Sequence, residues 1–300
     1  MKKRMLALLS ALCLTVSVFA GCGGNNDTAE PTPTNAPEAT ATIAPTATPE
    51  PTATTAPTAT PKPTATPKPT PTPFPVDPDD TGIWENNADI SWIDPEKPMI
   101  AFTFDDGPIG AADTSTSVRI QNALAASGQH ATFFYWGSRI NAATEKEIKR
   151  AYDMGFEIGN HTYSHSNLTT MDAGKIFEDV LKCADKLTAI TGLEHFLVRP
   201  PYLATNTTVK NTVREPMINC SIDSKDWDNA STEQILTTIR NQKKDGAIVL
   251  MHENYNTTAT AMETLIPELV AEGWQIVSVS ELFKAKGLEL KDGQVYNNAK

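Results

Sequence analysis

Short apolar runs alternate with amphipathic stretches along this 300-residue chain from about residue 76 onward. The runs are rich in β-branched and aromatic residues and stop at Gly, Pro or charged residues, which is typical of buried strands. They predict seven strands, at residues 99–104, 131–136, 156–159, 196–198, 217–222, 247–251 and 275–279. The stretches with helical spacing predict helices at residues 116–126, 143–154, 172–190, 206–214, 232–242, 258–271 and 279–286.

The regular alternation of strand and helix predicts an α/β fold with a parallel sheet, because each helix returns the chain to the same end of the sheet. Seven such units in about 200 residues suggest a closed or nearly closed, distorted (β/α) barrel. In barrels of this kind, the chemistry lies at the C-terminal ends of the strands. The polar residues that directly follow each apolar run are therefore the candidate site residues.

The first 22 residues carry a different pattern. A positively charged start, an apolar run at 5–19 and Ala20-Gly21-Cys22 are typical of an export signal, and the small residues before a cysteine resemble a bacterial lipoprotein signal. In that case Cys22 is the lipidated residue and the protein sits on the outer face of the cell membrane. Phe19 stands where that signal usually has Leu, so free secretion remains the alternative.

Residues 23–75 are dominated by Pro, Thr and Ala and hold 14 of the 22 prolines of the chain. This composition cannot bury a core, so it predicts a disordered linker that acts as a spacer. The composition becomes globular after it, and residues 76–300 are predicted to form one catalytic domain.

The formal net charge is −11 and the isoelectric point is about 4.9. A nucleic-acid partner is therefore not expected, and a neutral or cationic substrate suits the domain better than an anionic one. Of the four cysteines, only Cys183 and Cys220 lie in the domain. Their spacing excludes a cysteine metal cluster, and we interpret both as buried thiols, with a disulfide as the alternative.

The first strand run leads directly into Asp105-Asp106-Gly107-Pro108. Two neighbouring carboxylates in a buried site repel each other unless a cation or a proton separates them. A metal ion on one of them leaves the other free as a base. Taken alone, the same residues also fit an ordinary solvated turn.

Two histidines follow the strand run at 156–159, at His161 and His165. Imidazoles four residues apart can reach one ion, and one aspartate completes a His-His-Asp set with open positions for water. Such a set is typical of a catalytic divalent site. Zinc is the expected ion, and cobalt, nickel, manganese and iron are the alternatives.

Three further strand ends carry polar residues. Arg199, followed by two prolines, can form a rigid clamp for a carboxylate or simply belong to a stiff loop. Acids and the indole of Trp227 follow the run at 217–222, and His252 ends the apolar run at 247–251. All of them are expected to face the same cleft.

These residues form five ordered motifs, and the motifs resemble those of the polysaccharide deacetylases, carbohydrate esterase family four, also called the NodB homology domain. The motifs are residues 103–108, 161–165, 199–202, 223–227 and 250–252, and the resemblance extends over about residues 98–283. The family fold is a distorted (β/α) barrel. The resemblance implies metal-dependent removal of acetyl groups from a polysaccharide.

The resemblance places the metal and the base in the first three motifs. It implies that Asp106, His161 and His165 hold the ion and that Asp105 is the general base. Arg199 matches the residue that orients this base.

The remaining roles concern the leaving group and the substrate pocket. Asp226 matches the carboxylate that tunes the acid histidine, here His252, and the backbone N–H of Tyr202 matches the oxyanion donor. Leu203 stands where the family usually has Gly, so the loop after Tyr202 is expected to be shaped differently. The predicted substrate pocket contains Pro201, Trp227 and Leu250.

Three functions follow as expectations. The first is deacetylation of N-acetylglucosamine in peptidoglycan or a chitin-like polymer by a tethered, monomeric enzyme. The second is an acetylxylan esterase, which uses the same chemistry on an O-acetyl group. The third is a glycan-binding surface lipoprotein without catalysis, and the presence of both Asp105 and His252 argues against it.

Overall fold

The computed structural model describes residues 84–300, so the predicted signal segment, Cys22 and the linker at 23–75 lie outside the described residues. The strands are β1 Met99–Gly107, β2 Thr132–Tyr135, β3 Glu157–Asn160, β4 Met217–Ile218, β5 Ile222–Asp223, β6 Ala247–His252, β7 Gln275–Val277 and β8 Val295–Tyr296. The α-helices are α1 Thr116–Ala126, α2 Glu145–Asp153, α3 Ala173–Thr191, α4 Thr207–Thr212, α5 Thr232–Gln242, α6 Asn256–Ala271 and α7 Val279–Ala285.

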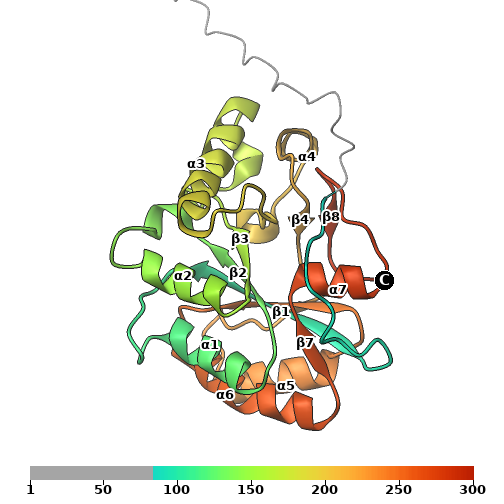
Figure 1. The fold of residues 1–300 in the computed structure, drawn as a ribbon. Helices are drawn as coiled ribbons and strands as arrows, with labels where there is room; N and C mark the ends of the chain where they lie inside the picture. The colour runs from blue at the N-terminus through green and yellow to red at the C-terminus, as the bar shows by residue number, and fades with distance from the viewer. Residues whose placement is uncertain (1–83) are drawn as a thin grey trace, which may run out of the picture. The chain divides into compact units, whose positions relative to one another are not determined.

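The strands form a parallel sheet in the order β3-β2-β1-β6-β5, and Figure 1 labels β1, β2 and β3 of this sheet. The long strand β1 is central because it pairs with β6 along one edge and with β7 and then β2 along the other. Beyond β3, Val198 bridges to Asn160 and Met217, and β4 pairs with β8. This arrangement confirms the predicted α/β fold with parallel strands around a distorted barrel.

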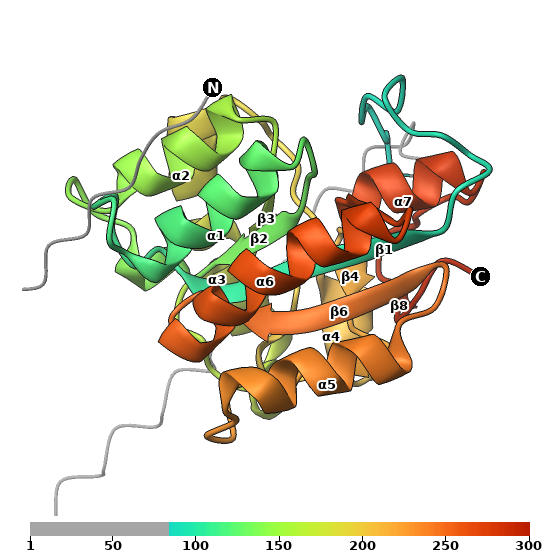
Figure 2. The ribbon, with the colours of Figure 1, turned by 90° about the horizontal axis from the view of Figure 1, so that it is seen from below.

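Strand β1 is buried on both faces, which explains why its sequence is a continuous apolar run. Alternate side chains enter two different clusters: Met99 and Ala101 pack with Ile248 and Val277, whereas Phe102 and Phe104 pack against helices. The second cluster includes apolar residues of α1, α2, α5 and α6, which cover the sheet (Figure 2). Because side chains alternate along a strand, Asp105 shares the face of Ala101 rather than that of Phe104.

The helix predictions agree with the structure to within two residues at nearly every boundary. Helices α5 and α7 begin at capping boxes, in which Ser231 and Ser278 each exchange hydrogen bonds with the residue three positions later. Such reciprocal bonds satisfy N–H groups that have no partner within the helix. Within residues 84–300, no helix has both the length and the apolar character to cross a membrane.

Two strand predictions were wrong in extent. Residues 196–198 do not form a strand, because only Val198 makes a ladder contact before Pro200 and Pro201, which lack N–H donors, end it. The predicted strand at 217–222 divides into β4 and β5. It divides because the backbone N–H of Asn219 bonds to Tyr296 whereas that of Ser221 bonds to Ile248, so the two parts pair with different neighbours.

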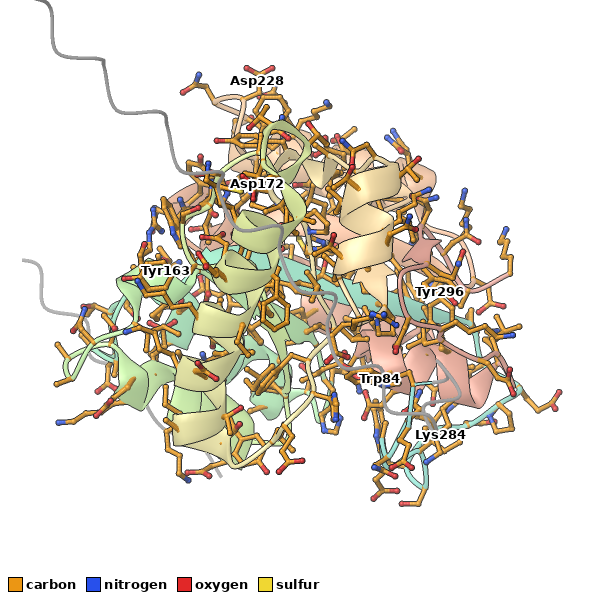
Figure 3. All side chains as sticks on the ribbon, turned by 90° about the horizontal axis from the view of Figure 1, so that it is seen from above. Trp84, Tyr163, Asp172, Asp228, Lys284 and Tyr296 are labelled. Carbon is orange, nitrogen blue, oxygen red and sulfur yellow. The ribbon has the colours of Figure 1, made fainter. Side chains whose placement is uncertain are left out.

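The ends of the domain pack together near α7. Trp84, Trp92 and Tyr296 contact the apolar cluster that includes Phe283, and the Trp84 N–H donates to the carbonyl of Leu290 at 3.0 Å. Figure 3 shows Trp84, Lys284 and Tyr296 on the same side of the domain. The two-residue strand β8 belongs to this region and was not predicted, because two residues carry no readable periodicity.

Candidate active site

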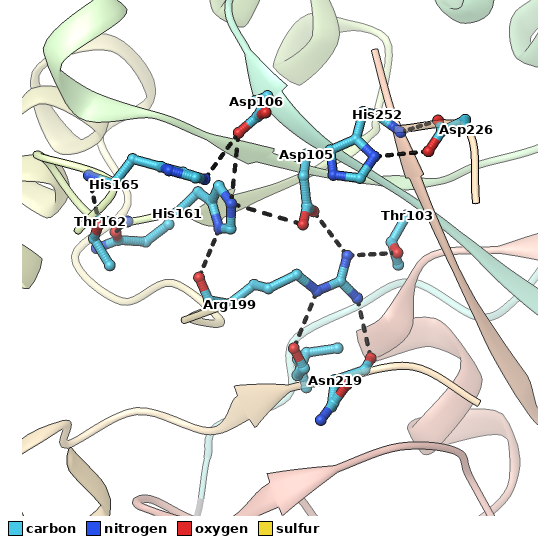
Figure 4. Close-up of polar contacts among 12 residues, drawn as sticks. Thr103, Asp105, Asp106, His161, Thr162, His165, Arg199, Asn219, Asp226 and His252 are labelled. Atoms are coloured by element: carbon cyan, nitrogen blue, oxygen red, sulfur yellow. Dashed lines mark hydrogen bonds and ion pairs between the residues drawn. The ribbon is translucent and has the colours of Figure 1, made fainter. Parts of the chain in front are cut away.

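The predicted site residues meet at the C-terminal ends of the strands (Figure 4). Asp105 lies near the end of β1 and directly opposite His252 at the end of β6. Histidines follow β3, Arg199 follows the bridge at Val198, and Asp226 follows β5. Residues up to 147 positions apart in the chain therefore share one region because the parallel strands end on the same edge.

Asp106, His161 and His165 form a group whose three ligand atoms lie within 4.8 Å of one another. Asp106 Oδ1 is 3.2 Å from His165 Nε2 and 3.7 Å from His161 Nε2. No donor among the described residues makes a well-aligned hydrogen bond to this buried oxygen. Two imidazole nitrogens around an unsatisfied carboxylate oxygen fit a divalent cation.

The protonation states in this group also suit a cation. His161 Nδ1 donates to the carbonyl oxygen of Arg199 at 2.7 Å, which leaves Nε2 as the lone-pair nitrogen facing Asp106. Burial lowers the pKa of His161, and the charges of Asp105 and Asp106 offset this only partly. Burial acts to raise the pKa of Asp106, but His165 and His161 outweigh it and lower that pKa to about 2.

The backbone around this group is held in uncommon conformations. Asp106, Thr162 and His165 have positive φ values of 72°, 63° and 56°. Non-glycine residues in this region cost free energy and persist only where neighbouring contacts fix them. Here the Arg139 guanidinium donates to the carbonyl of Asp106, and the Thr162 hydroxyl accepts the His165 N–H at 3.2 Å.

Asp105 is held by a buried arginine. Its Oδ1 accepts from Arg199 Nη1 at 2.8 Å, and its Oδ2 lies 3.7 Å from His161 Nε2. The Arg199 side chain is fully buried. It also donates hydrogen bonds to Thr103 Oγ1, at 2.7 Å, and to the carbonyl oxygens of Ile218 and Asn219. Such a buried pair fixes the carboxylate in position, because separating the two groups would leave a buried charge without its ion-pair partner.

His252 is paired with Asp226 on the other side of Asp105. Its Nδ1 lies 2.8 Å from Asp226 Oδ1, and Asp226 Oδ2 accepts the His252 backbone N–H and the Thr258 hydroxyl, each at 2.7 Å. Burial acts to lower the pKa of His252, but the bond to Asp226 and the nearby carboxylates outweigh it and raise that pKa to about 9. The imidazole is therefore cationic at neutral pH and can donate a proton.

The loop after Arg199 is a short 3₁₀ turn, Pro201–Leu203. Tyr202 and Leu203 both have positive φ, of 60° and 55°, and the Leu203 N–H donates to the Pro200 carbonyl at 3.0 Å. Leu203 thus adopts a conformation that glycine adopts readily, at a cost in strain. The backbone at Leu203 is therefore strained. The expected difference in loop shape from other family members stays a prediction.

The predicted pocket residues differ in exposure. Pro201 and Leu250 are buried, whereas Trp227 is 46% exposed and Tyr202 is 68% exposed. The Tyr202 ring centroid lies 5.2 Å from that of His165. Exposed aromatic rings beside the cation group and beside Asp226 are suited to contact with a sugar ring.

Sequence reasoning missed two residues that touch the site. Arg139 follows β2, stacks on Trp136 at 4.1 Å and binds the carbonyl of Asp106. Thr258 lies in α6 and binds Asp226 across 32 positions of sequence. The only signal in the sequence for either residue is that Arg139 comes just after an apolar run.

The two domain cysteines are free thiols, with Cys183 buried and Cys220 half-buried, so no disulfide joins them.

Comparison with known proteins places this site in a family. A family model described as polysaccharide deacetylase matches residues 93–220. The chain is 34% identical to the peptidoglycan-N-acetylmuramic acid deacetylase PdaC of Bacillus subtilis over 194 residues, which are 65% of this chain and 40% of PdaC. It is 32% identical to a peptidoglycan-N-acetylglucosamine deacetylase of Bacillus cereus over 206 residues, which are 66% of this chain and 94% of that protein.

A solved structure gives the same result for the fold. The family 4 acetyl xylan esterase from Clostridium thermocellum, in complex with a cobalt ion, matches with a TM-score of 0.62 and 30% identity. The match covers 67% of this chain and 98% of the esterase. This chain thus spans less than half the length of PdaC but nearly all of the two smaller relatives. The chain belongs to the polysaccharide deacetylase family.

Proposed function

We propose that this chain is a metal-dependent hydrolase that removes acetyl groups from N-acetylglucosamine residues of peptidoglycan or a chitin-like polymer. One observation carries the proposal: Asp105, fixed by Arg199, lies between the Asp106–His161–His165 group and the His252–Asp226 pair. A base, a cation site and an acid therefore adjoin one another. The names of the related deacetylases support the same chemistry.

Asp106, His161 and His165 would hold the cation, for which we propose zinc. A divalent cation there acts as a Lewis acid toward the acetyl carbonyl oxygen and makes a water molecule more acidic. The cobalt ion in the related esterase supports a divalent metal at this kind of site.

The side chains of this chain then divide the proton transfers. Asp105 accepts the proton of the attacking water, whose oxygen adds to the acetyl carbonyl carbon. The backbone N–H of Tyr202 stabilises the negative charge that develops on the carbonyl oxygen. His252 donates its proton to the sugar nitrogen as the C–N bond breaks, which gives acetate and a free amine.

A second candidate is O-deacetylation of xylan. The likeness to an acetyl xylan esterase favours it, and so does Leu203, which stands where the family usually has Gly after the tyrosine. A glycan-binding protein without catalysis is disfavoured, because binding alone needs neither a buried, fixed Asp105 nor a cationic His252.

For the cellular setting we propose a monomer anchored through a lipid at Cys22, outside the membrane and in the cell envelope. Residues 23–75 would serve as the spacer that lets the domain reach the wall. Secretion after cleavage near Ala20 is the alternative.

Acetate release measured side by side on peptidoglycan, chitooligosaccharide and acetylated xylan tests the proposal. We expect release from an N-acetylated polymer, and we expect Asp105→Asn to lower it by about 10²- to 10⁴-fold while the fold is retained. Faster release from acetylated xylan would favour the second candidate. Release from none of the three would overturn the proposed function.

A further inference from the structure

Two glutamates lie buried beside residues 105–110, which are the end of β1 and the loop that follows it, and the proposed chemistry uses neither of them. Glu147 belongs to α2 and Glu253 directly follows His252 at the end of β6. Both have 0% exposed surface. Carboxyl groups are almost never fully buried without a partner, so their contacts need an explanation.

Glu147 holds the loop from the helix side. Its Oε2 accepts the backbone N–H of Ile109, at 2.8 Å, and that of Gly110. These two amides follow Asp106 by three and four positions. A carboxylate that accepts two backbone N–H groups forms charge-assisted bonds, which are stronger than bonds between neutral groups.

Glu253 holds the same loop from the strand side. Its backbone N–H donates to the carbonyl of Asp105 at 3.1 Å, and its Oε2 accepts the hydroxyl of Ser117 in α1. Its carboxyl group also fills the space over Gly107, where a Cβ atom would lie 1.5 Å from Oε1. This packing gives a spatial reason for glycine at position 107.

The two glutamates also contact each other. Each carboxyl group affects the pKa of the other, and Oε1 of each is buried without a hydrogen-bond partner among the described residues. One proton between these two oxygens satisfies both at once. Because Glu147 accepts two backbone N–H groups, ionisation of its carboxyl group is favoured, and the proton is favoured on Glu253.

The surroundings favour this arrangement. Burial raises the pKa of Glu253, and the charges of Glu147 and Asp106 raise it further. Burial also raises the pKa of Glu147, which its backbone bonds partly offset. The other ionisable groups beside the pair are Tyr135 of β2, whose buried hydroxyl has no partner in the described residues, and Arg150 of α2.

We propose that Glu147 and Glu253 act as one positioning unit, a carboxyl pair sharing one proton that fixes residues 105–110, the end of β1 and the loop after it, against the strand end that carries His252. The pair sets the distance between Asp105 and His252, and neither glutamate touches the substrate. The inference deepens the proposed function, on which its kinetic readout rests. Its stability readout is independent of any activity.

The kinetic test compares Glu147→Ala with Glu253→Gln and Glu253→Leu. Glu147→Ala releases the loop and is expected to lower kcat for acetate release by about 10- to 100-fold, with a smaller change in KM. The amide of Glu253→Gln can still donate to Glu147, so this variant is expected to keep most of the kcat that Glu253→Leu loses. Glu157→Gln is the matched control, because that half-buried glutamate binds Thr132 and Ser280 instead of the loop. Its kcat should equal that of the wild type.

The stability test uses the pH dependence of Tm in the full chain. A carboxyl group with a raised pKa in the folded state is ionised first in the unfolded state, so the folded protein loses stability as pH rises above about 4.5. The fall in Tm from pH 5 to pH 9 should be at least about 3 °C smaller in Glu253→Gln than in the wild type.

An equal fall in Tm in Glu253→Gln and the wild type would overturn the shared proton, and a wild-type kcat in Glu147→Ala would overturn the positioning role. If Glu147→Ala does not fold, a kcat of Glu253→Gln as low as that of Glu253→Leu overturns the inference in its place. A wild-type protein that releases no acetate would contradict the proposed function alone, since the comparison of Tm values still decides whether the pair shares a proton.

Discussion

The two sides of the site are built by different means. The cation side, made of Asp106, His161 and His165, lies at the end of β1 and in the loop after β3, includes residues with positive φ, and has a buried oxygen without an aligned donor. The proton-transfer side pairs Asp105 with Arg199 and Asp226 with His252, and hydrogen bonds fix both pairs. The cation side has a strained backbone and an oxygen without a hydrogen bond, whereas the charged groups of the proton-transfer side are hydrogen-bonded to one another.

This contrast indicates what each side contributes. Strain and unmet hydrogen-bonding capacity are typical of a place where a ligand supplies the missing interactions. A network of satisfied buried charges instead contributes to the fold itself, because removing one member leaves another charge unpaired. Substitutions on the two sides should therefore differ in what they damage.

The largest contrast is expected between His165→Ala and His252→Ala. Loss of His165 should weaken zinc binding strongly while the fold is retained, because it removes one of the three predicted ligands. Loss of His252 should leave zinc binding unchanged and lower kcat by about 10²- to 10⁴-fold. Competition with a chromogenic chelator measures the first and acetate release the second. Equal zinc affinity in both variants would remove the distinction between the two sides.

Arg199→Met is expected to damage the fold. It leaves the carboxylate of Asp105 buried without its partner, which costs about 3–5 kcal/mol of unfolding free energy. Urea denaturation measures the loss. Arg240→Met, which breaks a half-buried pair with Glu268, is the control and should change the unfolding free energy far less. A similar loss of unfolding free energy in both variants would show that the buried Arg199–Asp105 pair contributes no more to stability than the Arg240–Glu268 pair.

Asp226→Asn is expected to shift the pH dependence. The raised pKa of His252, about 9, keeps it protonated in the metal-free protein, and a bound cation would lower this value. Without the charge of Asp226, the alkaline limb of kcat/KM should move down by about one pH unit or more. Because the folded-state pKa is raised, the stability from this pair is complete below pH 6.5 and is lost as pH rises toward 9. An alkaline limb of kcat/KM at the same pH in Asp226→Asn and the wild type would show that His252 is not the proton donor.

Leu203→Gly is expected to have the smallest effect. Glycine adopts the positive φ of 55° without strain, so the variant should be more stable by less than about 1 kcal/mol. Leu203→Ala is the control, because alanine keeps the strain and should bring no gain. Thermal melting of both variants decides whether the backbone or the side chain at this position matters.

Much of this architecture could be predicted from sequence because strands buried on both faces have continuous apolar runs and end in polar residues. Asp105, Arg199 and His252 are visible on that basis. The division of residues 217–222 and the pairing of Glu147 with Glu253 could not be predicted, since they depend on partners that are distant in the chain. Contacts of that kind leave no local period in the sequence.

Acetate release before and after metal removal tests the central claim most directly. The chelated protein should release no acetate above background from an N-acetylated polymer, and adding back zinc should restore the rate. In Asp105→Asn, zinc should bind without restoring the rate. A chelated, metal-free protein that releases acetate as fast as the untreated one would contradict the account.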